Sequence, residues 1–148
     1  MGWVEELHGK TVGLDTAPLI FYIEDHPIYA DLLDPFFEAA KAGEIRIVTS
    51  ILTLLEVLVH PLKRGDESLA HQYNDILLSS PHIFTIPVTP ATAQAAAELR
   101  ASSNLKTPDA IHLATAIHQH ADAFLTNDRD FSGVKSLSIL KVMDLQSS

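Results

Sequence analysis

The sequence predicts a single α/β domain with a mostly parallel β-sheet and helices on both of its faces. Short apolar segments alternate along the chain with longer segments of helical periodicity. Consecutive parallel strands need a crossover, and the crossover helices cover the faces of the sheet. A chain of 148 residues is long enough to bury a sizeable core. We assign the domain to residues 11–148 and expect residues 1–10 to be an N-terminal appendage, with Trp3 and Val4 docked on the core.

Five short apolar segments are the expected strands. They lie at residues 11–15, 46–49, 84–88, 123–126 and 138–142. Pro87 cannot donate a hydrogen bond to a neighbouring strand, so the third strand is expected at an edge of the sheet, or to end near this residue.

Six helices are expected between these strands. They lie at residues 17–23, 29–41, 51–59, 67–78, 90–102 and 108–120. Ser50, Asp66 and Thr89 each precede a helix and are expected to cap it through a side-chain oxygen. His60 and Pro61 are expected to end the third helix, because proline lacks the N–H that a helix interior requires.

Composition limits the classes of function. The formal charge of −9 argues against a broad basic surface that holds nucleic acid through phosphate contacts alone. The sequence has no cysteine, which excludes disulfides and thiolate metal sites and suits the reducing cytoplasm, where we expect the protein. No apolar run approaches the length of a membrane span, and residues 1–10 do not resemble a secretory signal, so we expect no membrane association.

The last helix begins with a distinctive sequence. Thr107 is expected to cap it through its hydroxyl group, and Pro108 suits the first helical position, where no N–H is needed. Asp109 follows in the first turn, where the helix dipole favours a negative charge. Since most of this helix is apolar, we expect it to be buried, with the carboxylate of Asp109 at its N-terminal end. A plain capping role for Asp109 is the alternative interpretation.

Four carboxylates are expected to converge. Asp15 and Asp128 follow strands and Asp109 opens a helix, so in a parallel sheet all three lie at one rim. Glu56 borders the apolar face of its helix, where it needs a cation, a metal or water as a partner; the alternative is that it points outward. Four carboxylates close together repel each other, and Mg²⁺ or Mn²⁺ would remove that repulsion. Such a cluster suits hydrolysis at phosphorus.

Four segments in this order resemble the PIN-domain nucleases, above all the VapC-type toxin ribonucleases. They are Val12-Gly13-Leu14-Asp15-Thr16, Thr49-Ser50 with Glu56, Thr107-Pro108-Asp109-Ala110-Ile111-His112-Leu113-Ala114-Thr115-Ala116 and Leu125-Thr126-Asn127-Asp128-Arg129-Asp130-Phe131. The resemblance covers about residues 11–143; the appendage at residues 1–10 departs from it.

This resemblance implies a three-layer α/β/α sandwich and a ribonuclease that hydrolyses RNA phosphodiester bonds with a divalent metal, as the toxin of a toxin–antitoxin pair. It implies that Asp15, Glu56, Asp109 and Asp128 are the catalytic and metal-binding residues. It also implies an antitoxin protein that inserts a basic residue, arginine above all, among these carboxylates.

Several other residues are candidates for auxiliary roles. Thr126 and Asn127 match polar residues that the family has beside the last acid, and Asp130 is a further candidate. Arg129 is expected either to hold an RNA phosphate or to form a surface ion pair, and Lys63 and Arg64 are further phosphate candidates.

His112 is expected to be structural, with a position in the acidic cleft as the alternative. The apolar stripes that contain Phe36 and Leu54 are expected to be mainly core, with part of them available for a homodimer or for the antitoxin.

Three other classes of protein share part of this pattern. A phosphatase of the haloacid dehalogenase type needs a second Asp two residues after the first, and Ala17 stands there. A receiver domain needs a phosphorylatable Asp after its central strand, and none can be assigned. The third alternative is a non-catalytic α/β binding module whose carboxylates are only helix caps. Such a module would show no metal dependence and little effect of Asp15→Asn.

Overall fold

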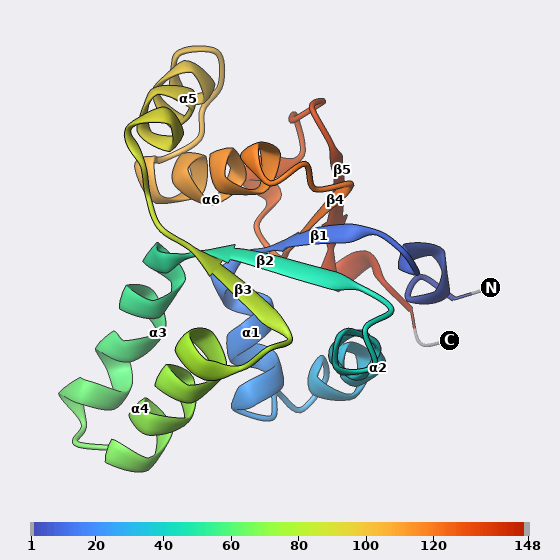
Figure 1. Cartoon of the computed structure of the whole chain (residues 1–148), viewed down its shortest axis with the longest axis vertical. Helices are drawn as coiled ribbons and strands as arrows, with labels where there is room; N and C mark the ends of the chain where they lie inside the picture. Colours follow the sequence, from blue (N-terminus) through green and yellow to red (C-terminus); the bar gives the residue numbers. More distant parts are fainter. Residues whose placement is uncertain (1, 147–148) are drawn as a thin grey trace.

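A computed structural model of the chain describes residues 2–146, which form one parallel β-sheet between two layers of helices (Figure 1). The strands are β1 (Thr11–Leu14), β2 (Arg46–Ser50), β3 (Ile83–Ile86), β4 (Ala123–Thr126) and β5 (Ser138–Lys141). The order across the sheet is β3-β2-β1-β4-β5, which places β1 at the centre. The third strand lies at an edge and ends just before Pro87, as its sequence predicts.

Helices cover both faces of the sheet. They are α1 (Thr16–Ile23), α2 (Ala30–Lys41), α3 (Ile51–Lys63), α4 (Glu67–Asn74), α5 (Pro90–Ala101) and α6 (Thr107–His118). In Figure 1, α5 and α6 lie on one side of the sheet, and α1 to α4 lie on the other. The predicted three-layer α/β/α fold is confirmed.

The core is divided in two because successive side chains of a strand point to opposite faces. Val12 and Leu14 of β1 pack into the larger cluster, with residues of α1 to α4. Phe124 of β4 packs into the smaller cluster, beside α5 and α6. Gly13 faces α6, where a Cβ atom would lie 2.5 Å from the Cβ of Ala116, so only glycine allows the helix this close.

The predicted caps of three helices are confirmed. The side chains of Ser50, Asp66 and Thr89 accept hydrogen bonds from the backbone N–H groups of Leu52, Leu69 and Thr92, at 3.1, 3.1 and 3.2 Å. Each bond satisfies one donor that the first helical turn leaves free. The cap of α3 matters for the site, because it sets where the helix that carries Glu56 begins.

Two predicted helix details are wrong, and one predicted helix ends in an irregular turn. Helix α3 continues through the buried Pro61 and ends before Gly65, whose φ of +69° suits the end of a helix. The helix expected at residues 67–78 is present, as α4 followed without a break by a π-helical turn, Asp75–Ser79. Thr107 is the first residue of α6 and does not cap it, and its hydroxyl accepts a hydrogen bond from Arg100.

The residues that precede β1 pack against the domain. They include a 3-10 helix, Glu5–Leu7. Val4 and Leu7 are buried in the larger cluster, and the ring of Trp3 stacks on Phe36 with 5.6 Å between centroids. Within residues 2–146, none of the helices has the length and hydrophobicity that crossing a bilayer requires.

Candidate active site

The candidate site is centred on the carboxyl ends of β1 and β4, which are parallel neighbours. Asp15 follows β1 and caps α1 by accepting a hydrogen bond from the N–H of Thr16 at 2.9 Å. Its other oxygen accepts a hydrogen bond from the hydroxyl of Thr126 at 2.7 Å. That hydroxyl accepts in turn from the N–H of Asp128 at 3.0 Å. These bonds fix the buried carboxylate of Asp15 relative to the loop after β4.

A cavity of about 640 Å³ opens at this edge of the sheet. It is lined by Asp15, Thr16, Ala17, Ile20, Phe21, Glu56, Asp109, Asn127, Asp128, Arg129 and Met143. All four carboxylates that the sequence brings together thus border one cavity. They come from four separate segments, which the parallel topology of the sheet places side by side.

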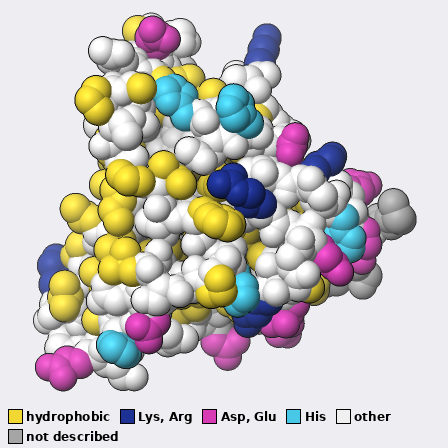
Figure 2. Space-filling view, viewed as in Figure 1, with side chains coloured by type: hydrophobic (Ala, Val, Ile, Leu, Met, Phe, Trp, Pro, Cys, Tyr) yellow, Lys and Arg dark blue, Asp and Glu magenta, His cyan; other side chains and the backbone are white. Residues whose placement is uncertain are grey.

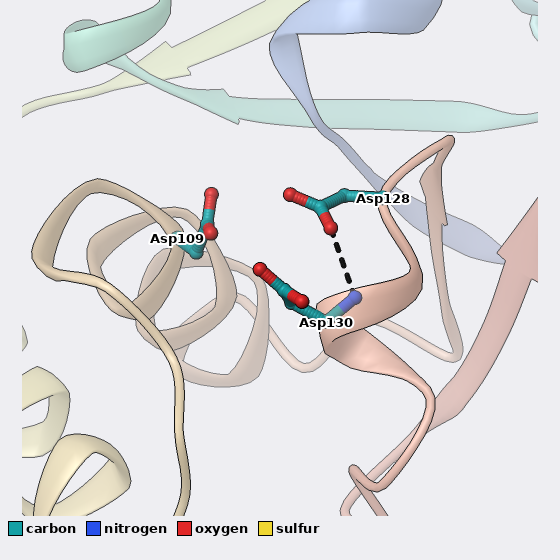
Figure 3. Close-up of side chains that lie close together, drawn as sticks. All are labelled: Asp109, Asp128 and Asp130. Carbon is teal, nitrogen blue, oxygen red and sulfur yellow. Dashed lines mark hydrogen bonds between the residues drawn. The ribbon is translucent and has the colours of Figure 1, made fainter.

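Three aspartates lie close enough together to share a cation (Figure 3). One carboxylate oxygen from each of Asp109, Asp128 and Asp130 lies within 4.8 Å of the other two. Asp130 is held near Asp128 because its backbone N–H donates to a carboxylate oxygen of Asp128 at 2.9 Å. Carboxylate oxygens at this spacing are the ligands that a hard divalent cation prefers, so the donor set fits the metal that the fold implies.

The electrostatics of the rim favour a cation. Burial raises the pKa of Asp109 to about 6, and the nearby carboxylates of Asp15 and Asp128 add to this rise. Burial also raises the pKa of Asp15, although His112 and the hydrogen bond from Thr126 act against it. A cation would favour the ionised form of both aspartates and remove their repulsion.

Glu56 differs from the aspartates because two donors contact one of its oxygens. The hydroxyl of Thr16 lies 2.7 Å from Oε1 of Glu56, and Nε2 of His112 lies 2.5 Å from the same atom. Burial acts to raise the pKa of Glu56, but the hydrogen bonds from His112 and Thr16 outweigh burial, and the pKa is lowered. Glu56 is therefore held as a carboxylate without a metal.

No role is predicted for Thr16 from the sequence, and a structural role is favoured for His112. Thr16 is the residue after Asp15, and His112 lies three residues after Asp109 on α6. The three-residue spacing between Asp109 and His112 was the signal that could have placed His112 at the site, because residues three apart share a face of a helix.

The remaining candidates are divided between the cavity and the surface. Asn127 lines the cavity, and its side-chain oxygen accepts a hydrogen bond from the N–H of Met143 at 2.9 Å, which ties the loop to the C-terminal segment. Arg129 also lines the cavity. Lys63 and Arg64 are not among its lining residues, and Arg64 forms exposed ion pairs with carboxylates outside the site.

Comparison with solved structures shows the same fold in several toxin–antitoxin proteins. VapBC2 from Rickettsia felis, bound to a DNA fragment from its promoter, has 21% identity and a TM-score of 0.68, over 88% of this chain and 98% of that chain. A toxin–antitoxin complex from Klebsiella pneumoniae has 24% identity and a TM-score of 0.63, over 89% and 97%. VapC20 from Mycobacterium tuberculosis, a toxin that cleaves the sarcin–ricin loop, has 18% identity and a TM-score of 0.64, over 86% and 98%.

Comparison at the level of families gives a match over most of the chain. A comparison with curated proteins finds no match. The family model described as PIN domain matches residues 12–137. This range includes β2, β3 and β4, all of β1 except Thr11, and every carboxylate of the cavity, and it ends just before β5. The chain therefore belongs to the PIN domain family.

Proposed function

We propose that this protein is a divalent-metal-dependent ribonuclease that hydrolyses RNA phosphodiester bonds and serves as the toxin of a toxin–antitoxin pair. The observation that carries the proposal is the single cavity bordered by Asp15, Glu56, Asp109 and Asp128. Membership of the PIN domain family and the likeness to toxin–antitoxin proteins support it. The absence of cysteine supports action in the reducing cytoplasm.

We assign the binding of Mg²⁺ or Mn²⁺ to the aspartates of the rim. Asp15 with Asp109 and Asp128 would hold the cation, and Asp130 offers a further oxygen close to two of them. When bound, the cation would activate water and offset the charge that develops on the phosphate oxygens. The hydrogen bonds to Asp15 from Thr16 and Thr126 keep its carboxylate oriented toward this role.

Other residues of the cavity act on water and on RNA. Glu56 accepts the proton of the attacking water while the water oxygen bonds to phosphorus, the ester P–O bond breaks, and the leaving oxygen takes up a proton from solvent. Arg129 contacts an RNA phosphate at the mouth of the cavity. Asn127 holds the loop that carries Asp128, through its bond to Met143. Hydrolysis then needs only water and RNA as reactants.

A non-catalytic binding module is the second candidate. Two observations favour it, because Asp15 caps α1 and Asp128 caps the short 3-10 turn that follows β4. In a module of this kind, both carboxylates would serve only the local backbone.

Asp15→Asn separates the two candidates. The amide keeps the size of the side chain and removes one charge from the rim. We expect cleavage of RNA to fall by about 100-fold or more, the loss typical of removing one preorganised charged group. We expect the metal-free Tm to stay the same or rise, because fewer like charges then repel. RNA cleavage with Mg²⁺ or Mn²⁺ and metal-free thermal unfolding measure these effects.

The control is Asp31→Asn, which removes one charge from the exposed start of α2, outside the residues that line the cavity. It should leave both cleavage and Tm unchanged. Equal cleavage by wild type and Asp15→Asn would reject the catalytic role. Loss of cleavage together with unfolding would favour the capping role.

We also propose an antitoxin partner that inserts an arginine into the cavity. The four carboxylates of the cavity would pair with the guanidinium group of such an arginine. Two of the similar structures, VapBC2 and the Klebsiella pneumoniae toxin–antitoxin complex, also support a protein partner. Co-purification of this protein with the product of a neighbouring open reading frame, and a pull-down between the two, test for this partner. Asp15→Asn should weaken the complex if the arginine enters here.

A second copy of the chain is the proposed partner for an apolar stripe on α3. Leu55, Val59 and Leu62 are 61%, 38% and 66% exposed, and their spacing places them on one face of the helix. Figure 2 shows hydrophobic side chains gathered over the α3 side of this view. Phe36 is buried and Leu54 packs against the core, as expected of the stripes that contain them, so the exposed stripe on α3 is a different one. Light scattering should give the mass of a dimer for wild type and of a monomer for Leu55→Asp.

A further inference from the structure

Glu56 has two oxygens with different surroundings. Oε1 lies within hydrogen-bond distance of both the Thr16 hydroxyl, at 2.7 Å, and Nε2 of His112, at 2.5 Å. Oε2 has no hydrogen-bond partner among residues 2–146. An ionised carboxylate only accepts hydrogen bonds, so both neighbours must donate to Oε1. Two donors at one oxygen fix the plane of the carboxylate and leave the other oxygen for a ligand in the cavity.

His112 makes this contact from inside the core. Its side chain is 1% exposed, and the next two residues of α6, Leu113 and Ala114, are buried and apolar. The ring nitrogen Nδ1 is buried and has no hydrogen-bond partner in the described part of the chain. An aliphatic residue would fill this volume without an unsatisfied polar atom. The contact with Glu56 is therefore what the imidazole provides.

We propose that His112 is a positioning residue, which holds Oε1 of Glu56 together with Thr16 so that Oε2 is presented to the attacking water. This inference rests on the proposed ribonuclease activity. Nε2 donates in the neutral Nε2–H tautomer and in the imidazolium form alike, so the role needs one N–H donor and no change of protonation. The other close carboxylate oxygen, Oδ1 of Asp15, lies 4.0 Å from Nε2, which is too far for a hydrogen bond.

Two amide substitutions test the position of the donor. In His112→Gln the amide nitrogen stands as many bonds from Cα as Nε2 does, whereas in His112→Asn it stands one bond closer to the backbone. We expect kcat for RNA cleavage to fall by about tenfold or more in His112→Asn, the size typical of losing an outer-shell partner, with KM within about twofold. His112→Gln should restore kcat to within about threefold of wild type.

His118→Gln is the matched control, because it makes the same substitution at an exposed position at the end of α6. Its kcat and KM should equal those of wild type. Thr16→Val is the second test of the same arrangement, since it removes the other donor to Oε1 and does not depend on the folding of a core variant. It should lower kcat with little change in KM.

Crystal structures of the metal-free variants give a readout that does not depend on activity. Glu56 should keep its place in His112→Gln and turn away in His112→Asn. The proposal is overturned if His112→Asn keeps its kcat, if His112→Gln loses as much as His112→Asn, or if Thr16→Val has no effect. Absence of RNA cleavage by wild type would refute the proposed function alone, and the position of Glu56 in the two structures would still decide the role of His112.

Discussion

At the scale of the residue, the buried carboxylate of Asp109 lowers the stability of the metal-free protein when it is ionised. It lies in the first turn of α6, where the helix dipole favours its charge, yet its pKa is raised to about 6. Burial contributes most, followed by the carboxylates of Asp15 and Asp128. The folded protein therefore holds a proton at Asp109 at pH values where the unfolded chain has lost it.

This predicts a pH dependence of stability that Asp109→Asn should reduce. The stabilising effect of the raised pKa is complete below about pH 4 and is lost as the pH rises through about 6. Relative to wild type, Asp109→Asn should thus become more stable across this window when metal is absent. Urea unfolding with EDTA at several pH values measures the difference.

Asp31→Asn is again the control and should follow the wild-type curve. Parallel curves for wild type and Asp109→Asn would contradict the prediction. Asp15 has a pKa that is raised in the same direction, so part of the pH dependence should persist in Asp109→Asn.

At the scale of the element, the contact between β1 and α6 sets the geometry of the rim. β1 leads to Asp15, and α6 carries Asp109 and His112. The two elements approach closely at Gly13, where a Cβ atom would lie 2.5 Å from Cβ of Ala116 and 2.9 Å from a ring carbon of Phe124. Any increase in volume here must move α6 or β1.

Gly13→Ala should therefore destabilise the protein by about 1–3 kcal/mol, as overpacking of a core does. It should also lower RNA cleavage, because the displaced helix carries part of the site. Gly133→Ala is the control, since a Cβ atom there meets nothing within 4 Å. Urea unfolding of both variants measures the difference in the free energy of unfolding. If Gly13→Ala were as stable as Gly133→Ala, the prediction would be wrong, because α6 would then move without destabilising the protein.

At the scale of the whole molecule, charge determines how RNA can approach. The sequence has 19 acidic and 10 basic residues, and the cavity itself is lined by four carboxylates and one arginine. A chain with a net charge of −9 repels a polyanion at long range. We therefore expect RNA binding to depend on cations that neutralise the rim.

RNA affinity should rise by about tenfold or more when Mn²⁺ replaces EDTA, because the metal removes repulsion between the carboxylates and phosphate. Glu56→Gln is the variant to use, since it keeps the aspartates and should slow cleavage. Fluorescence anisotropy measures binding. Sodium chloride at the same ionic strength should increase affinity much less than Mn²⁺ does, because it screens the repulsion but is not held by the carboxylates. Tight binding of RNA in EDTA would contradict the prediction.

The sequence by itself determined the elements and the rim of the site. Apolar segments and caps are local signals, so they predicted the five strands and the caps at Ser50, Asp66 and Thr89. A parallel sheet brings the ends of its strands to one edge, so Asp15 and Asp128 could be placed together before any coordinates were known.

Only the tertiary structure decided which atoms meet. The Oε1 atom of Glu56 receives donors 40 and 56 residues away in the sequence, from Thr16 and His112. The hydroxyl of Thr107, which the local sequence pattern predicted to cap α6, accepts a hydrogen bond from Arg100. Hydrophobic periodicity fixes the face of a helix, whereas a hydrogen bond depends on side-chain rotamers and on the distance between packed helices. Those distances are set by contacts across the whole core.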